Sequence, residues 1–284
     1  MKLTLTIIII LTFNLNTLAQ LTNGVVILPQ PVFPSSSQTQ QNAIAADSSG
    51  NIWVGYKFIG IGKFANGSWT VFDSINNGLL SNTVNAIAVD SNNNIWIGTK
   101  NGLQKFDGTT FQSFTVANSG LIDNQITTLF IKGNIIYIGT KAGLSIFNGN
   151  IWLSFNKANS SLVSDTITAI AVTTNNDIYI GTINGLSCRT LSGNWITYDS
   201  TTTEIENYIT ALLVDSNSIY IGTKTTTYKL FANTVISFKN FLNCNDDLNF
   251  PTNSFAKTSD GKIYFGNHTF PLYEGITAIL KNIF

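Results

Sequence analysis

The chain has 284 residues, of which 44% are hydrophobic, 12% aromatic and only 11% charged. Fifteen basic side chains balance fifteen acidic ones, so no overall electrostatic field attracts nucleic acid or an anionic membrane, and neither is an expected partner. The chain is rich in Ile, Thr, Asn and Ser, and β-branched and aromatic side chains suit a pleated, half-buried surface. This composition predicts an all-β fold.

The first twenty residues, MKLTLTIIIILTFNLNTLAQ, have the parts of an export signal. Lys2 precedes an apolar run, and Thr17-Leu18-Ala19 place small residues where a signal peptidase cuts. The run is shorter than the about 20 apolar residues that a transmembrane helix needs, and asparagines interrupt it. We therefore expect residues 1–19 to be a signal peptide. The mature protein is then secreted or periplasmic, in the envelope of a Gram-negative bacterium, with no membrane span.

One phrase returns along the rest of the chain, and NIWIGTKNGLQKF at residues 94–106 is its clearest copy. Its glycine recurs every 41 to 44 residues: Gly55, Gly98, Gly139, Gly181, Gly222 and Gly266. An aromatic residue stands two places before each glycine: Trp53, Trp96, Tyr137, Tyr179, Tyr220 and Tyr264. This spacing predicts six repeats, which begin near residues 42, 85, 126, 167, 209 and 252. We expect the repeated glycine to allow a close backbone approach or a bulge.

Each repeat contains four short apolar runs separated by turns rich in Asp, Asn, Ser and Gly. In the second repeat these runs are Val84–Val89, residues 94–98, Leu103–Phe106 and residues 111–114. Strands of this length joined by such turns form a hairpin meander. Asp47, Asp90 and Asp215 begin turns, where we expect each carboxylate to cap its own backbone rather than bind calcium.

A four-stranded unit of about 42 residues, repeated, is typical of a β-propeller blade. We therefore expect residues 42–284 to form a propeller of six four-stranded blades, in which Ile276–Leu280 is the last strand. Residues 24–28, in the N-terminal segment 20–41, lie 43 residues before the fourth strand of the first repeat. They occupy the same phase of the repeat and could close the ring. A seven-bladed propeller, or an incomplete ring closed by that strand, are the alternatives.

The pattern N-x-I-x-A-I-A-x-D-x-x-x-N-I-W-I-G-T-x-x-G-L-x-x-F, best matched by residues 85–106, resembles the two-component regulator propeller repeat. Such repeats occur in exported bacterial proteins and in the sensor ectodomains of hybrid two-component systems that respond to polysaccharides. The resemblance extends over nearly all of the mature chain but weakens in the fifth copy, where Thr226-Thr227 replaces Gly-Leu. It implies a non-catalytic binding or sensor-like module for a glycan fragment or a protein partner.

Two sets of polar residues are predicted to lie on one face of the ring. In a meander, the turn between the second and third strands shares a face with the connection to the next blade. The first set follows the repeated glycine by two: Lys57, Lys100, Lys141, Lys224 and His268, with Ile183 in the fourth blade. The second set opens the first strand: Asn82, Asn124, Asp165 and Asn207. Solvated turn residues are the simpler interpretation. As a site, the cations would attract an anionic small ligand such as an acidic glycan, and Phe58 and Tyr208 could stack on sugar rings.

Two other functions stay open from the sequence. A polysaccharide lyase or hydrolase needs paired carboxyl groups, and the nearest acidic pairs are Glu204/Glu206 and Asp246/Asp247. A protein-interaction scaffold would instead carry an exposed apolar patch. The lone histidine has no nucleophile that a motif places beside it, so no catalytic residue is assigned. No cluster of Cys and His predicts a metal site and no cofactor is expected. Cys188 and Cys244 occupy different phases of the repeat and are expected to be unpaired.

Overall fold

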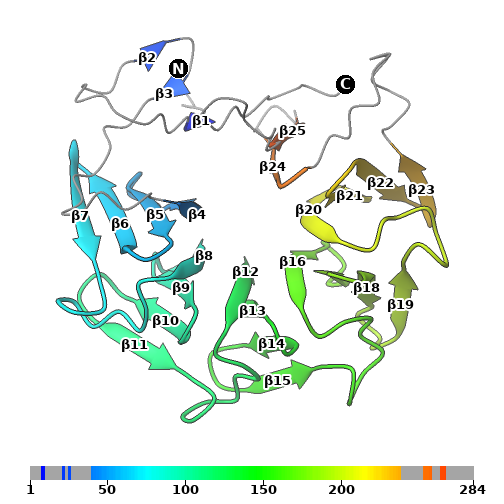
Figure 1. Ribbon diagram of the computed structural model, residues 1–284, viewed down its shortest axis with the longest axis horizontal. Coiled ribbons are helices and arrows are strands. Elements are labelled where there is room, and N and C mark those ends of the chain that lie inside the picture. Colours follow the sequence, from blue (N-terminus) through cyan, green and yellow to red (C-terminus); the bar gives the residue numbers. More distant parts are fainter. Residues whose placement is uncertain are drawn as a thin grey trace.

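The computed structural model describes residues 40–237, 252–257 and 263–266, together with the backbone of three two-residue strands nearer the N-terminus. Every regular element in these ranges is a β-strand. The strands form separate sheets that are arranged as blades around a central axis (Figure 1). The predicted all-β propeller is therefore confirmed.

Five complete blades are antiparallel meanders of four strands. Blade 1 contains β4 (Gln41–Ala46), β5 (Ile52–Tyr56), β6 (Gly60–Ala65) and β7 (Ser68–Phe72). Blade 2 contains β8 (Val84–Val89), β9 (Ile95–Thr99), β10 (Gly102–Phe106) and β11 (Phe111–Phe114). Blade 3 contains β12 (Ile126–Lys132), β13 (Ile135–Thr140), β14 (Leu144–Phe147) and β15 (Trp152–Phe155). Blade 4 contains β16 (Ile167–Val172), β17 (Ile178–Thr182), β18 (Gly185–Arg189) and β19 (Trp195–Tyr198). Blade 5 contains β20 (Ile209–Asp215), β21 (Ser218–Thr223), β22 (Thr227–Phe231) and β23 (Thr234–Ser237).

A sixth sheet follows blade 5 and contains β24 (Ser254–Lys257) and β25 (Ile263–Gly266), paired antiparallel. These are the first and second strands of the sixth repeat, and its expected fourth strand, residues 276–280, lies outside the described residues. Within the segment suggested to close the ring, residues 25–26 form β3 (Val25–Val26). This strand pairs with β1 (Ile8–Ile9) and β2 (Leu21–Thr22) in a sheet of their own. Closure of the ring by that segment stays a prediction.

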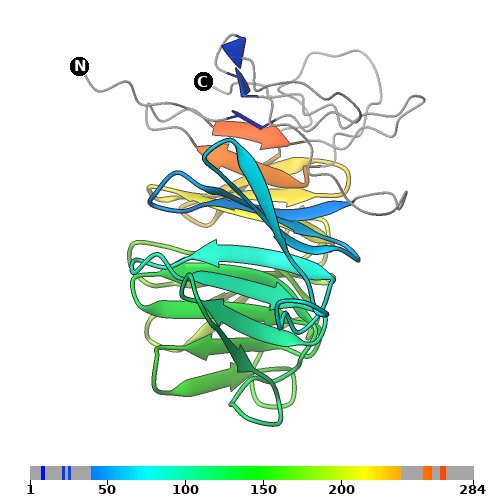
Figure 2. The same ribbon diagram turned by 90° about the vertical axis from the view of Figure 1, so that its left-hand side faces the viewer.

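The first strand of each blade lies nearest the axis and the fourth lies at the rim (Figure 1), and the sheets stack on one another around the ring (Figure 2). Hydrophobic clusters fill the space between consecutive blades. One of them joins Trp53 and Ile61 of blade 1 to Val84 and Ile97 of blade 2, and all four side chains are buried. The core of this protein is therefore divided among the interfaces between blades.

The repeated glycine lies in the second strand, where the first strand of the next blade packs against it. A methyl group on Gly55 would lie 2.6 Å from Cγ1 of Val84, and one on Gly98 would lie 2.5 Å from Cγ2 of Ile126. A register shift in the first strand of each complete blade lies opposite the glycine, as between Val84 and Ala86. Both expectations for the glycine are confirmed: it allows a close approach, and it faces a bulge.

In blades 1 and 2 the Asp that begins the turn between the first and second strands also binds the repeated Trp. Asp90 Oδ1 accepts hydrogen bonds from the backbone N–H groups of Asn92 and Asn94, both at 2.9 Å. Its Oδ2 accepts the indole Nε1–H of Trp96 at 2.9 Å. Asp47 binds Trp53 in the same way at 3.0 Å. The capping role is therefore confirmed in these two blades, which are also the two with Trp.

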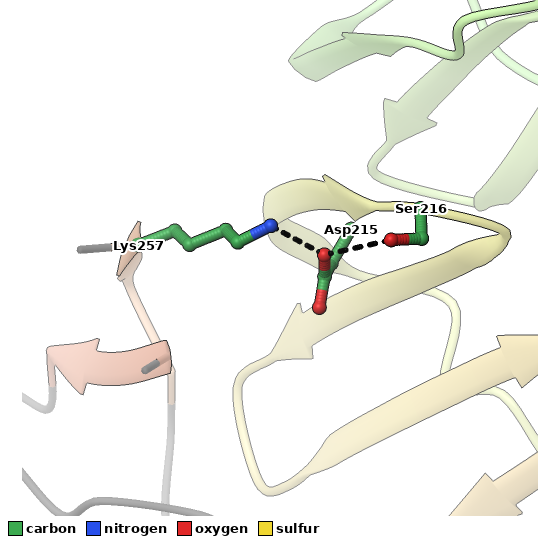
Figure 3. Close-up of polar contacts among 3 residues, drawn as sticks. All are labelled: Asp215, Ser216 and Lys257. Atoms are coloured by element: carbon green, nitrogen blue, oxygen red, sulfur yellow. Dashed lines mark hydrogen bonds and ion pairs between the residues drawn. The ribbon is translucent and has the colours of Figure 1, made fainter. Parts of the chain in front are cut away.

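Asp215 differs from the expectation, because its turn contains only two residues, Ser216 and Asn217. The carboxylate cannot cap a longer loop, and its Oδ1 instead lies 2.5 Å from Nζ of Lys257 in β24 (Figure 3). The ion pair connects blade 5 to the sixth sheet.

The first strands are also joined by side chains at one repeated position. Asn42 Nδ2 donates to the carbonyl of Val84 at 3.2 Å, and Asn85 Nδ2 donates to the carbonyl of Ile126 at 2.8 Å. Thr210 likewise donates to the carbonyl of Thr252, two residues before β24. The equivalent residues of blades 3 and 4 are Thr127 and Thr168, whose buried hydroxyls have no hydrogen-bond partner. Contacts between blades are therefore less complete in the middle of the chain.

Candidate functional site

The turns that carry the lysine set are fixed by hydrogen bonds repeated from blade to blade. The Thr99 hydroxyl, fully buried, donates to the carbonyl of Gly102 at 2.8 Å, and Thr140, Thr182 and Thr223 form the same contact. The backbone N–H of Lys100 donates to the carbonyl of Thr83 at 3.1 Å, which ties the turn to the start of the first strand. The expectation of local threonine hydrogen bonds is confirmed, and the turn holds its lysine at a defined point.

The lysine side chains themselves extend from this rigid base. Lys100, Lys141 and Lys224 are exposed, whereas Lys57 is half-buried. In blade 4 the position equivalent to these lysines is occupied by Ile183. His268, the sixth member of the set, lies beyond the part of the chain that the structure describes.

The Asn and Asp set has a structural function that the sequence pattern did not indicate. Each side-chain Oδ1 accepts a backbone N–H from the connection between two blades. The pairs are Asn82 with Ser74, Asn124 with Val116, Asp165 with Lys157, and Asn207 with Ser200, at 2.7 to 3.1 Å. These oxygens stabilise the loops, so only the remaining atoms of these side chains are available to a ligand.

Two lysines of this face are paired with exposed aromatic rings. Lys57 Nζ lies 5.2 Å from the ring centroid of Phe58, and Lys224 Nζ lies 3.6 Å from that of Tyr208. Cations at these distances are attracted by the negative face of the ring. The sequence pointed to each residue separately, but only the structure shows that they form pairs.

The backbone of Phe58 is unusual. The turn between β5 and β6 has three residues where the equivalent turn of blade 2 has two, and the extra residue places Phe58 in the left-handed region with φ of 74°. A bulky side chain rarely adopts this conformation, because its Cβ crowds the backbone. The ring is nevertheless 66% exposed, so no burial compensates for the strain. Strain of this kind is often found at functional sites.

The acidic residues considered for catalysis are only partly described. Glu206 Oε2 lies 3.0 Å from the Thr223 hydroxyl, and its Oε1 accepts a hydrogen bond from Thr225. Glu204 is exposed, whereas Asp246 and Asp247 lie outside the described ranges. Glu206 therefore serves at least to hold the turn of blade 5. Within residues 40–237, 252–257 and 263–266, no group of three or more potential metal ligands comes together.

The sequence of blade 2 identifies the type of repeat. Residues 78–101, which run from the connection after blade 1 through β8 and β9, match the family described as the two component regulator propeller. The resemblance is confirmed. The matched propeller repeat thus includes the Asp90 turn, Trp96, Gly98 and Lys100, and ends at the lysine turn. No curated protein matches the chain.

Solved structures of similar fold include the extracellular domains of two hybrid two component systems from B. thetaiotaomicron. Both are 21% identical to this chain with TM-scores of 0.69. The matches cover 83% and 89% of this chain but only 32% and 34% of the ectodomains, so this chain spans about a third of their length. Virginiamycin B lyase from Staphylococcus aureus is also similar, with 14% identity, a TM-score of 0.63, and coverage of 83% of this chain and 79% of the lyase. At these identities the likeness establishes the fold.

The described residues contain no helix that is both long and apolar enough to cross a membrane.

Proposed function

We propose that this propeller is an exported, non-catalytic binding module of the sensor type. Residues 1–19 would direct export, in keeping with the signal-like sequence. The structural neighbours support this proposal in part, since two of them are extracellular domains of hybrid two component systems. The ligand would be held on the face that carries the lysine turns, and an acidic glycan fragment fits the chemistry of that face best.

The observation that carries this proposal is the pairing of a lysine ammonium with an exposed aromatic ring. An aromatic face packs against the C–H groups of a sugar ring, while the adjacent ammonium attracts a carboxylate or sulfate. Lys57 with Phe58 offers this combination in blade 1, and Lys224 with Tyr208 offers it in blade 5. Lys100 and Lys141 add exposed positive charge in blades 2 and 3. A lysine is a flexible point charge, so it attracts anions without fixing their orientation.

Calorimetric titration of the full chain with oligogalacturonate, and with a neutral oligoglucan of equal length, tests this function. The acidic oligomer is expected to bind, more weakly as salt increases, because exposed charges are screened. Phe58→Ala and Lys224→Met should each weaken binding. Equal affinity for the neutral oligomer, or binding that ignores both substitutions, would contradict the proposal.

The fourth blade allows a gain-of-function test, because Ile183 stands where the other blades have Lys. Ile183→Lys should strengthen binding of the acidic oligomer about two- to fivefold, since one exposed ion pair contributes on the order of 0.5–1 kcal/mol. The matched change Ile183→Gln supplies a polar side chain without charge and should leave the affinity unchanged.

A protein-interaction scaffold is a second candidate, because apolar side chains are exposed at the rim of three consecutive blades. Leu153 of β15 is 55% exposed, and Ile196 of β19 and Ile236 of β23 occupy the same register position in blades 4 and 5. Blades 1 and 2 have Thr70 and Gln112 there. If these side chains bind a partner, Leu153→Lys with Ile196→Lys should abolish co-purification of that partner from the native host without lowering the melting temperature.

A further inference from the structure

A cavity of about 310 Å³ lies between blades 2 and 3, among turns on the face opposite the lysine turns. The Asp90–Asn94 turn, β10 and β11 of blade 2 form one side of it. The two-residue turn Gly133–Asn134 and the β14–β15 turn of blade 3 form the other. This interblade cleft belongs to neither polar set predicted from the sequence.

The cleft exists because the facing turns differ in length. Blades 1 and 2 both have five-residue turns at this point, and these are joined by a hydrogen bond of 2.7 Å from the Ser48 N–H to Asn93 Oδ1. Blade 3 has only two residues in its turn, so it leaves space beside the longer turn of blade 2. Between blades 3 and 4, Lys132 extends across and donates to the carbonyl of Thr173 and to Asn176 Oδ1.

Blades 4 and 5 also combine a long and a short turn, but their side chains differ. The position of Lys105, opposite the repeated aromatic residue, is occupied in blade 4 by Cys188, which is buried. Ile196 follows in the outer strand, where blade 2 has Gln112. These two positions are therefore apolar in blade 4, whereas Lys105 and Gln112 make them polar in blade 2, beside the interblade cleft.

The interblade cleft has an aromatic wall and a cation that lacks an acceptor. Trp96 stacks on Phe114 with ring centroids 5.7 Å apart, and Lys105 Nζ lies 5.9 Å from the Trp96 ring centroid. Within the described part of the chain, Lys105 makes no salt bridge and donates no hydrogen bond. The side-chain amides of Gln112 and Asn134 are likewise without hydrogen-bond partners in the described residues, and both line the cleft.

Asp90 is the negative charge of the interblade cleft, and its oxygens are already occupied. They accept two backbone N–H groups, the amide of Asn94 and the indole N–H of Trp96. These donors stabilise the carboxylate, so it has little remaining capacity for Lys105 or for a ligand hydroxyl. Of the two charged groups in the interblade cleft, the one left without a partner is therefore the Lys105 ammonium.

We propose that the interblade cleft binds one acidic monosaccharide. The carboxylate would accept from Lys105, the C–H face of the ring would pack on the aromatic wall that Trp96 and Phe114 contribute, and hydroxyls would bind the amides of Gln112 and Asn134. The volume lies at the lower end of the about 300–1,000 Å³ typical of ligand pockets, which favours a single sugar unit over an oligomer. This site is separate from the lysine face and does not depend on the proposed function.

Titration of the full chain with glucuronate and with glucose, followed by NMR of the tryptophan indole N–H signals, tests the site. Glucuronate should shift the Trp96 signal and glucose should not. Lys105→Met keeps the aliphatic stem over the ring but removes the charge, and should weaken glucuronate binding about tenfold or more, the loss typical of a charged hydrogen bond. Gln112→Ala should weaken it by a smaller factor.

Lys63→Met is the matched control, since Lys63 Nζ lies 5.2 Å from the Trp53 ring centroid at the equivalent position of blade 1. It should leave binding unchanged, and so should Lys224→Met on the lysine face. Equal loss from the Lys63 and Lys105 variants, unchanged binding by Lys105→Met, or no shift of the Trp96 signal would each overturn the site. Loss with Lys224→Met alone would instead place the ligand on the lysine face and support only the proposed function.

Discussion

Replacing Gly98 with alanine tests whether the repeated glycine exists to let blades approach each other. The added methyl group would lie 2.5 Å from Cγ2 and 3.1 Å from Cβ of Ile126. Carbon atoms in favourable contact are about 3.5–4.0 Å apart, so about 1 Å of space is missing. Ile126 is fully buried at the start of β12, and it cannot move without shifting blade 3.

Whether Gly98→Ala stabilises or destabilises the protein shows whether the close contact between blades requires the glycine. In a strand, Gly→Ala by itself is expected to stabilise by about 0.4–1 kcal/mol, because alanine restricts the unfolded chain. Overpacking a tight interface costs about 1–3 kcal/mol. We therefore expect Gly98→Ala to lower the free energy of unfolding by about 1–2 kcal/mol, which corresponds to a fall of about 3–6 °C in melting temperature.

Urea denaturation followed by tryptophan fluorescence measures this change, and a double-mutant cycle with Ile126→Ala locates its origin. Ile126→Ala removes the Cγ2 that the new methyl would meet, so Gly98→Ala should cost less in that background, by about 0.5 kcal/mol or more. A stabilising Gly98→Ala, or a cycle in which the two changes simply add, would refute the contact between blades as the reason for the glycine.

Three further outcomes are expected. Asp90→Asn should lower the free energy of unfolding by about 1.5–3 kcal/mol at pH 7, because both carboxylate oxygens accept hydrogen bonds and the amide NH2 that replaces one of them cannot accept. Burial raises the pKa of Asp90, but the hydrogen bonds from Trp96 and the turn lower the pKa by a larger amount. The folded-state pKa therefore lies below its ordinary value. The stabilisation by Asp90 is therefore present above about pH 4 and lost as the pH falls through the lower folded-state pKa, so the difference between the wild type and Asp90→Asn should shrink in urea melts as the pH is lowered below about 4. Thr127→Asn should stabilise by about 0.5–1.5 kcal/mol, since Asn at the equivalent positions of blades 1 and 2 donates to the next blade; a lower melting temperature would contradict this. Burial raises the pKa of the Cys188 thiol to about 11, so in a Cys244→Ser chain at pH 8 iodoacetamide should modify it only after unfolding, as measured by mass spectrometry.

The fold follows from the sequence because a propeller blade is a local structure. Each strand pairs with its neighbour in the chain, so the Asn- and Gly-rich turns specify the meander, and the period specifies the number of blades. Val84–Val89, for example, is a strand with the predicted bounds. The Asp90 cap was equally predictable, since its partners lie within six residues.

The candidate sites depend on contacts between segments that the repeat does not specify. The pairing of Lys224 with Tyr208 joins two separate turns, and the strained backbone of Phe58 follows from one inserted residue. The structural role of Asn82 was missed because its partner, the Ser74 N–H, lies in a loop without a repeated pattern.

The blade, its period, its turns and the face on which the lysines lie can all be derived from the sequence, because they depend on interactions within about 40 residues. The features between blades, in contrast, depend on how the repeats pack in three dimensions. The interblade cleft beside Lys105 arises where a five-residue turn faces a two-residue turn of the next blade. The close contact of Gly98 with Ile126 likewise requires both blades to be in place. Such features depend on differences between neighbouring repeats, and they are visible only when the repeats are packed side by side.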